Sequence, residues 1–151
     1  MPAFRWSIPE RLNIGSDVAD RHPGALALIE IDPSGSVRKL TFDEISALSN
    51  RFANVLVARG LKRGDRIAIL LPQRHETGVA HAAAWKAGMI SVPLFTLFGE
   101  EALEFRLQNS GARAIVTDRN AVAQAKKEFA EATQGKPYVS PLAADAKPQV
   151  F

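Results

Sequence analysis

Residues 60–94, GLKRGDRIAILLPQRHETGVAHAAAWKAGMISVPL, decide the fold that we expect for this chain. The almost unbroken apolar run at 66–71 has the length of a strand and is typical of a parallel sheet buried on both faces. An alanine-rich segment from about 75 to 87 predicts a helix, and Gly88 is a residue that commonly follows a helix end. Residues 89–92 predict a second short strand, closed by Pro93. A strand–helix–strand unit of this kind predicts an α/β domain with a right-handed crossover.

Two further patterns precede this unit. Residues 25–31 and 37–40 predict an antiparallel hairpin with a turn at 32–36. The serine and glycine of that turn are interpreted as turn residues and not as a phosphate loop, because no helix start and no lysine follow them. Thr41 and Glu44 form a capping box that predicts the start of a helix, and Gly60 ends it. The apolar stripe of this helix leaves residues 49–51 (Ser49, Asn50 and Arg51) expected on the solvent side.

The remaining segments continue the alternation of helix and strand. We expect a short helix near the N-terminus with Ser16 or Asp17 as its N-cap and an end near residues 22–24. After the central unit, the sequence predicts the following elements: a helix over 99–109 with Leu103 and Leu107 on its inner face, a strand over 113–117 and a helix over 118–132. The expected fold class is therefore α/β, a mostly parallel sheet flanked by helices, with an N-terminal antiparallel hairpin.

Composition restricts the class of protein further. The chain has 151 residues, of which 46% are hydrophobic and 23% charged, which is ordinary for a globular domain. Its net charge of +3 is small and interspersed, so it does not indicate nucleic-acid binding. It contains no cysteine, which excludes disulfides and thiolate chemistry, and it has no apolar run of transmembrane length. We expect a cytoplasmic protein.

Few residues suggest chemistry by themselves. The three histidines, His22, His75 and His81, are dispersed and without acids at metal-ligand spacing, so we expect structural or surface roles and no metal site. The Asp65-Arg66 pair looks like an ion-pair motif, but it is interpreted as a turn and strand entry. The sequence contains no Gly-x-Ser-x-Gly elbow, Walker-type loop or Gly-x-Gly-x-x-Gly motif, so no catalytic residue is assigned.

Four segments together resemble the N-terminal part of the adenylate-forming, AMP-forming acyl-CoA synthetases. They are TFDEISALSNRFANVLVARG (41–60), GLKRGDRIAILLPQ (60–73) followed by Glu76, WKAGMISVPL (85–94) and LFGEEALEFRLQNSGARAIVTD (97–118). Their order and spacing resemble the bacterial acetyl- and medium-chain types most, and the resemblance covers roughly residues 4–120. Residues 1–133 are thus expected to form part of the large N-terminal domain of that family, and 134–151 a proline-containing tail or linker.

The resemblance implies the chemistry of an acid–CoA ligase in the full-length parent. A carboxylic acid and ATP, with Mg²⁺, give an acyl-adenylate and pyrophosphate, and CoA then gives the thioester and AMP. The family's Gly/Ser/Thr-rich loop ending in Pro-Lys-Gly, its ribose-binding Asp and its mobile Lys do not occur in these residues, so this chain alone is expected to be inactive. The missing remainder of a synthetase is its expected partner, and exposed apolar faces predict self-association.

The resemblance also suggests contacts with substrates. Arg119, Lys126 and Lys127 are the basic residues near a rim that meets the CoA phosphate in relatives, and the alternative is a solvated helix face. Trp85 and Phe98 could border the acyl side, with core packing as the alternative. Two other functions stay open: a small nucleotide-binding α/β module and a non-catalytic interaction protein.

Overall fold

A computed structural model describes residues 4–7 and 9–118. The chain forms, in order, the following elements: α1 (Ile14–Ala19), β1 (Leu26–Ile31), β2 (Val37–Thr41), α2 (Phe42–Ala58), β3 (Arg66–Leu70), α3 (His75–Lys86), β4 (Ile90–Leu94), α4 (Glu100–Ser110) and β5 (Ala114–Thr117). None of the helices in these ranges is long and apolar enough to cross a membrane.

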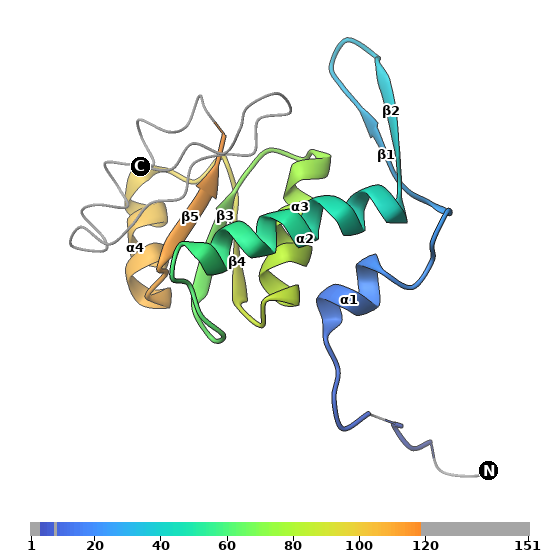
Figure 1. Cartoon of the computed structure of the whole chain (residues 1–151). Coiled ribbons are helices and arrows are strands. Elements are labelled where there is room, and N and C mark those ends of the chain that lie inside the picture. Colours follow the sequence, from blue (N-terminus) through green and yellow to red (C-terminus); the bar gives the residue numbers. More distant parts are fainter. Residues whose placement is uncertain (1–3, 8, 119–151) are drawn as a thin grey trace.

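Strands β3, β4 and β5 form a parallel sheet in the order β4-β3-β5, and β1 and β2 form a separate antiparallel pair. Helices α2 and α3 cover one face of the parallel sheet and α4 covers the other (Figure 1). The α/β class with an N-terminal hairpin, predicted from the sequence, is confirmed. The central strand β3 is buried on both faces, which explains its nearly continuous apolar sequence.

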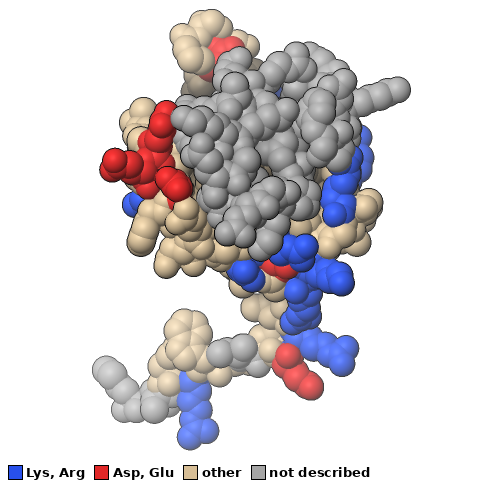
Figure 2. All heavy atoms as spheres, turned by 90° about the vertical axis from the view of Figure 1, so that its left-hand side faces the viewer, with Lys and Arg blue, Asp and Glu red and all other residues tan. Residues whose placement is uncertain are grey.

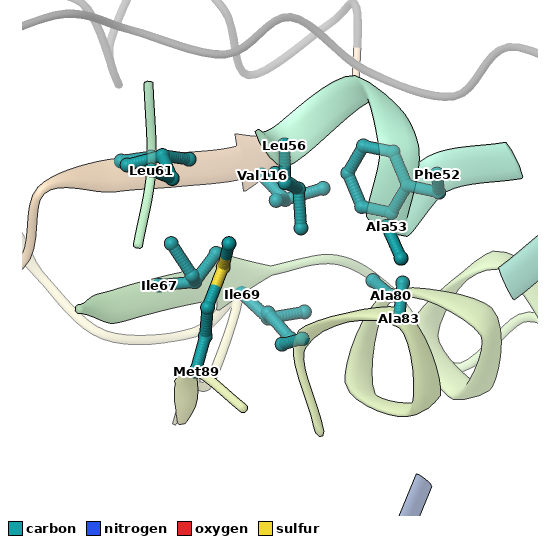
Figure 3. Close-up of a cluster of buried hydrophobic side chains, with 12 residues drawn as sticks. Phe52, Ala53, Leu56, Leu61, Ile67, Ile69, Ala80, Ala83, Met89 and Val116 are labelled. Atoms are coloured by element: carbon teal, nitrogen blue, oxygen red, sulfur yellow. The ribbon is translucent and has the colours of Figure 1, made fainter. Parts of the chain in front are cut away.

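The larger core cluster lies between β3 and the helices α2 and α3 (Figure 3). Ile67 and Ile69 point to this face, because alternate residues of a strand face the same side. Phe52 and Leu56 of α2 pack on them, and the alanines of α3 allow that helix to approach the sheet closely. The opposite face is covered by Leu103 and Leu107 of α4, the inner-face residues that the sequence predicts.

The β1–β2 hairpin stands away from the parallel sheet, near the start of α2 (Figure 1). Its turn is held by Asp32, whose carboxylate accepts hydrogen bonds from the amides of Ser34 and Ser36 at 2.8 and 3.0 Å. At the base of the hairpin, Leu40 of β2 packs in a third cluster with Ile45 of α2 and Val79 of α3. The turn is therefore a hairpin turn, as expected, and has no helix behind it that could hold a phosphate.

The sequence predicted the capping box of α2 correctly, but it predicted the N-cap and the end of α1 incorrectly. The Thr41 side chain accepts from the Glu44 amide at 3.3 Å, and the Glu44 carboxylate accepts from the Thr41 amide at 2.7 Å. The N-cap of α1 is Asn13 and not Ser16 or Asp17, because Asn13 Oδ1 accepts from the amides of the first turn. Helix α1 also ends at Ala19, before the expected range 22–24.

Two side-chain environments also differ from the expectation. Pro93 lies inside β4 opposite Ile69 and does not close the strand, which is possible because β4 is an edge strand in the described sheet. Ser49 was expected on the solvent side but has an exposed fraction of 0%, and its hydroxyl donates to the Ser46 carbonyl. The predicted helix over 118–132 and the tail at 134–151 fall outside the described residues, apart from Asp118.

Candidate functional site at the carboxyl edge of the sheet

The carboxyl ends of β3 and β4 form a crevice. The chain leaves β3 towards α3 on one face of the sheet and leaves β4 towards α4 on the opposite face. The carboxyl edge of the strands is the side on which open α/β sheets bind ligands. A cavity of about 210 Å³ lies there, lined among others by Leu71, Pro72, His81, Phe95 and Phe98.

The lining of this cavity is mostly apolar, and none of the described residues that line it is an Asp, Glu, Lys or Arg. Burial lowers the pKa of His81, so its imidazole is neutral near pH 7. The buried Nδ1 atom of His81 has no hydrogen-bond partner among the described residues. The Thr77 hydroxyl on the same wall donates to the Pro72 carbonyl at 2.7 Å. The cavity is thus suited to a neutral apolar group and not to a phosphate.

The two aromatic residues suggested for the acyl side lie near this cavity in different ways. Phe98 lines it, is partly buried against the α4 core cluster, and carries the Arg106 guanidinium 4.1 Å from its ring centre. Trp85 is partly buried and packs its ring against His81, with ring centres 5.5 Å apart. Phe98 therefore combines a core contact with a place at the cavity, whereas Trp85 reaches the cavity through His81.

A polar cluster lies at the start of α3, beside the hairpin. The Nδ1 atom of His75 is 2.5 Å from Glu30 Oε2 and 3.1 Å from Glu76 Oε2. Arg74 places its Nε 3.2 Å from the other oxygen of Glu30. Glu30 also accepts from the His75 amide at 3.3 Å, although it lies 45 residues earlier in the chain. A strand residue of the hairpin therefore binds the first turn of a distant helix.

The two carboxylates of this cluster differ in the hydrogen bonds that they accept. Burial acts to raise the pKa of Glu30, but its hydrogen bonds from His75 and Arg74 outweigh this, and the pKa is lowered. Glu76 Oε2 is buried and accepts no hydrogen bond from the described residues. The sequence did not predict this cluster, because Glu30 reaches His75 only through the tertiary fold. Two local signals were present: Glu76 directly follows His75, and no side chain caps the start of α3.

The remaining sequence-based candidates have structural roles or lie outside the described residues. Asp65 accepts from the Lys62 amide at 2.7 Å and pairs with Arg113 at 3.1 Å. Arg66 donates to the carbonyls of Ser110 and Gly111 at the end of α4. The turn and strand-entry interpretation of Asp65-Arg66 is thus confirmed. The proposed CoA-contacting residues Arg119, Lys126 and Lys127 all lie outside the described range.

Figure 2 shows one group of acidic side chains at the left of this face, and basic side chains at its right and lower right with single acidic side chains among them. The basic side chains at the lower right therefore have acidic neighbours and do not form an unbroken basic surface on the described part of that face.

The fold and the crevice together define part of an open α/β domain of the ligand-binding type. Residues 16–149 match the family described as "AMP-binding enzyme". The chain is 34% identical over 129 residues to an acetyl-coenzyme A synthetase of Magnetococcus marinus, an alignment that covers 82% of this chain and 20% of that relative. The chain therefore belongs to the AMP-binding enzyme family, as the resemblance in its sequence predicted.

Solved structures agree with this family. The structure of a Brucella canis acyl-CoA synthetase is similar with a TM-score of 0.76 and 30% identity, over 92% of this chain and 26% of that one. ATP-bound MatB from Rhodopseudomonas palustris is similar with a TM-score of 0.69 and 26% identity, over 85% of this chain and 25% of that one. The chain spans about a fifth to a quarter of the length of these relatives.

Proposed function

We propose that this chain supplies part of the N-terminal domain of an AMP-forming acid–CoA ligase. The reaction joins a carboxylate to the AMP group of ATP with release of pyrophosphate, and the CoA thiol then displaces AMP to give the thioester. The observation that supports this most is the 34% identity over 129 residues to an acetyl-coenzyme A synthetase, together with the agreement of the whole described fold with an acyl-CoA synthetase. Short- or medium-chain or aromatic acids are the substrates that we propose, with Mg²⁺ accompanying ATP.

A chimera tests this function directly. Residues 16–149 would replace the matching segment of the Magnetococcus marinus acetyl-coenzyme A synthetase, and thioester formation from acetate, ATP and CoA would be measured. We expect a folded chimera with ligase activity, because the described core and crevice belong to the same fold. A chimera that is folded by circular dichroism but releases no pyrophosphate from ATP and acetate would contradict the proposal.

The 151-residue chain alone is proposed to be inactive. Its sequence contains no Gly/Ser/Thr-rich loop ending in Pro-Lys-Gly, and the described crevice offers a neutral apolar lining and no phosphate cradle. The purified chain with acetate, ATP and Mg²⁺ should therefore release no pyrophosphate above a protein-free blank. Release that depends on the added chain would overturn this part of the proposal and leave the family assignment intact.

A CoA contact by Arg119, Lys126 or Lys127 is proposed for the complete enzyme, and the basic character of this segment is what supports it. Reversing the charge of Lys126 and Lys127 to Glu in the active chimera should raise the KM for CoA and leave the KM for ATP unchanged. Lys39→Glu, on the exposed hairpin, is the matched control. If the KM for CoA is equal in the chimera, in its Lys126 and Lys127 variant and in the Lys39→Glu control, the two lysines belong to a solvated surface.

Self-association, or binding to the remainder of a synthetase, is proposed from the hairpin surface. Ile29, Ile31 and Val37 are exposed there, with Ile31 at 67%, and the hairpin has unpaired strand edges within the described residues. Sedimentation velocity at increasing concentration should show a growing dimer fraction, and Ile31→Lys should reduce it. A cytoplasmic location is also proposed, with the cysteine-free sequence as its support.

A further inference from the structure

Glu30, His75 and Glu76 bring together three atoms of the kinds that bind metal ions. One carboxylate oxygen from each glutamate and one ring nitrogen of the histidine lie within 4.8 Å of one another. The His75 side chain is only 5% exposed, and those of Glu30 and Glu76 are 11% and 12% exposed. The group therefore lies at the junction of the hairpin and α3, largely screened from solvent.

One hydrogen on the Nδ1 atom of His75 cannot form full hydrogen bonds to both carboxylates. The Nδ1 atom of His75 carries at most one hydrogen, and Glu30 Oε2 is the nearer acceptor at 2.5 Å. Glu76 Oε2 lies 3.1 Å from the same nitrogen and 3.7 Å from Arg74 Nε, is buried, and accepts no hydrogen bond from the described residues. A buried carboxylate oxygen that accepts no hydrogen bond is costly. A divalent cation at the centre of the three atoms would contact all of them at once.

We propose that Glu30, His75 and Glu76 bind a divalent transition-metal ion, and that Zn²⁺ is the ion that fits them best. Imidazole nitrogen with carboxylate oxygen is a zinc-type ligand set, whereas Mg²⁺ prefers oxygen ligands and retains its water. Two carboxylates balance the charge of the ion. Three protein ligands also leave a fourth position to water or to a ligand from solution.

Binding requires only small changes at the two contacts that involve His75. Ligands around a tetrahedral zinc ion lie about 3.4 Å apart when each is about 2.1 Å from the metal. The Glu30–His75 contact therefore has to open from 2.5 Å by about 1 Å, and the Glu76–His75 contact of 3.1 Å hardly changes. Arg74 contacts the outer oxygen of Glu30 and lies 3.7 Å from Glu76 Oε2, and its side chain is 56% exposed, so it can turn into solvent when the ion binds.

Such an ion would join two parts of the fold. Glu30 belongs to β1, whereas His75 and Glu76 belong to the first turn of α3, 45 residues further along the chain. An ion that binds the folded arrangement and not the dispersed ligands of the unfolded chain stabilises the fold. The melting temperature of the chain should therefore rise with zinc.

The test uses the complete 151-residue chain, produced without a polyhistidine tag and treated with EDTA. Calorimetric titration with ZnSO₄ should show one equivalent bound, and MgCl₂ should show none. Glu76→Gln and His75→Gln should each weaken zinc binding about tenfold or more and remove the rise in melting temperature. Glu101→Gln, on the exposed side of α4, and His22→Gln are the matched controls and should bind as the parent does.

Three results would overturn the proposal. They are no saturable zinc heat in the parent chain, equal weakening by His22→Gln and His75→Gln, or unchanged zinc binding in Glu76→Gln. If His75→Gln does not fold, Glu76→Gln decides alone, because the hydrogen bonds that Glu30 accepts from Arg74 and from the His75 amide do not involve Glu76. Substitution of cobalt for zinc should give the visible absorption of a nitrogen- and oxygen-bound ion in the parent and not in Glu76→Gln.

Discussion

Gly15 provides the sharpest test of how α1 packs on α3. A Cβ atom added at Gly15 would lie 2.7 Å from the Ala82 carbonyl oxygen and still closer to the Lys86 amide nitrogen. Ordinary contact begins at 3.4 Å, so α1 would have to move away from backbone atoms that cannot turn aside. That displacement also strains the bond between Asn13 Nδ2 and the Lys86 carbonyl, which is 3.0 Å long.

We expect Gly15→Ala to lower the free energy of unfolding by about 2 kcal/mol. Overpacking of this kind costs about 1–3 kcal/mol, and the gain in helix propensity near a helix start is below about 1 kcal/mol. The matched control is Gly78→Ala. Gly78 is exposed inside α3, and an added Cβ meets no atom within 4 Å. Gly78→Ala should raise the free energy of unfolding by about 1 kcal/mol.

Urea unfolding followed by circular dichroism measures both variants against the parent chain at constant m. The free energies of unfolding of the two variants should then differ by about 3 kcal/mol, with Gly15→Ala below the parent and Gly78→Ala above it. If Gly15→Ala is as stable as Gly78→Ala to within about 0.5 kcal/mol, the close packing of α1 on α3 is wrong.

Three further outcomes follow from single side chains. Thr41→Ala removes the acceptor of the capping box and should lower the free energy of unfolding by about 1 kcal/mol in urea titrations. Ile69→Val deletes one buried methyl group and should cost about 1 kcal/mol in the same assay. The pKa of Asp65 is lowered because, although burial opposes this, a backbone amide and Arg113 bond its carboxylate. Its folded pKa lies below its unfolded value, so this stability is present above the unfolded value of 3.8 and is lost as pH falls through the folded pKa.

Each of these outcomes has a control within the chain. Thr96→Ala changes an exposed loop threonine and should alter the free energy of unfolding by less than about 0.5 kcal/mol. Ile90→Val tests an isoleucine that is 52% exposed and should cost much less than Ile69→Val. Asp65→Asn should flatten the pH dependence of stability below about pH 5, and an unchanged slope would show that other carboxylates carry it.

The elements that the sequence predicted well are those set by contacts near in the chain. The capping box of Thr41 and Glu44 needs only residues three apart, and Gly60 takes a positive φ of 80° just after α2, where glycine has no steric penalty. The apolar run of β3 predicted a strand buried on both faces because no polar residue interrupts it after Arg66. These features can be predicted from the sequence without knowing which residues pack against them.

Ser49 was predicted wrongly because it is polar, although it lies four residues after Ile45 and three before Phe52 on the buried stripe of α2. Two other features that were predicted wrongly depend on residues far along the chain. Pro93 fits inside β4 because, in the described sheet, only one side of that strand bonds to a partner. Asn13 is the N-cap of α1 in preference to Ser16, and its side chain also donates to the carbonyl of Lys86.

The cluster at the start of α3 shows how a missing local signal can indicate a distant partner. Arg74 occupies the N-cap position but offers no acceptor to the first amides of the helix, whereas most helices supply one from that residue. Those amides still need partners, and Glu30 of the hairpin accepts from the His75 amide. An uncapped helix start that follows a buried strand therefore predicts that a polar side chain from elsewhere reaches it. In this chain the residue that does so is a carboxylate, and its contact with His75 and Arg74 couples the hairpin to the parallel sheet.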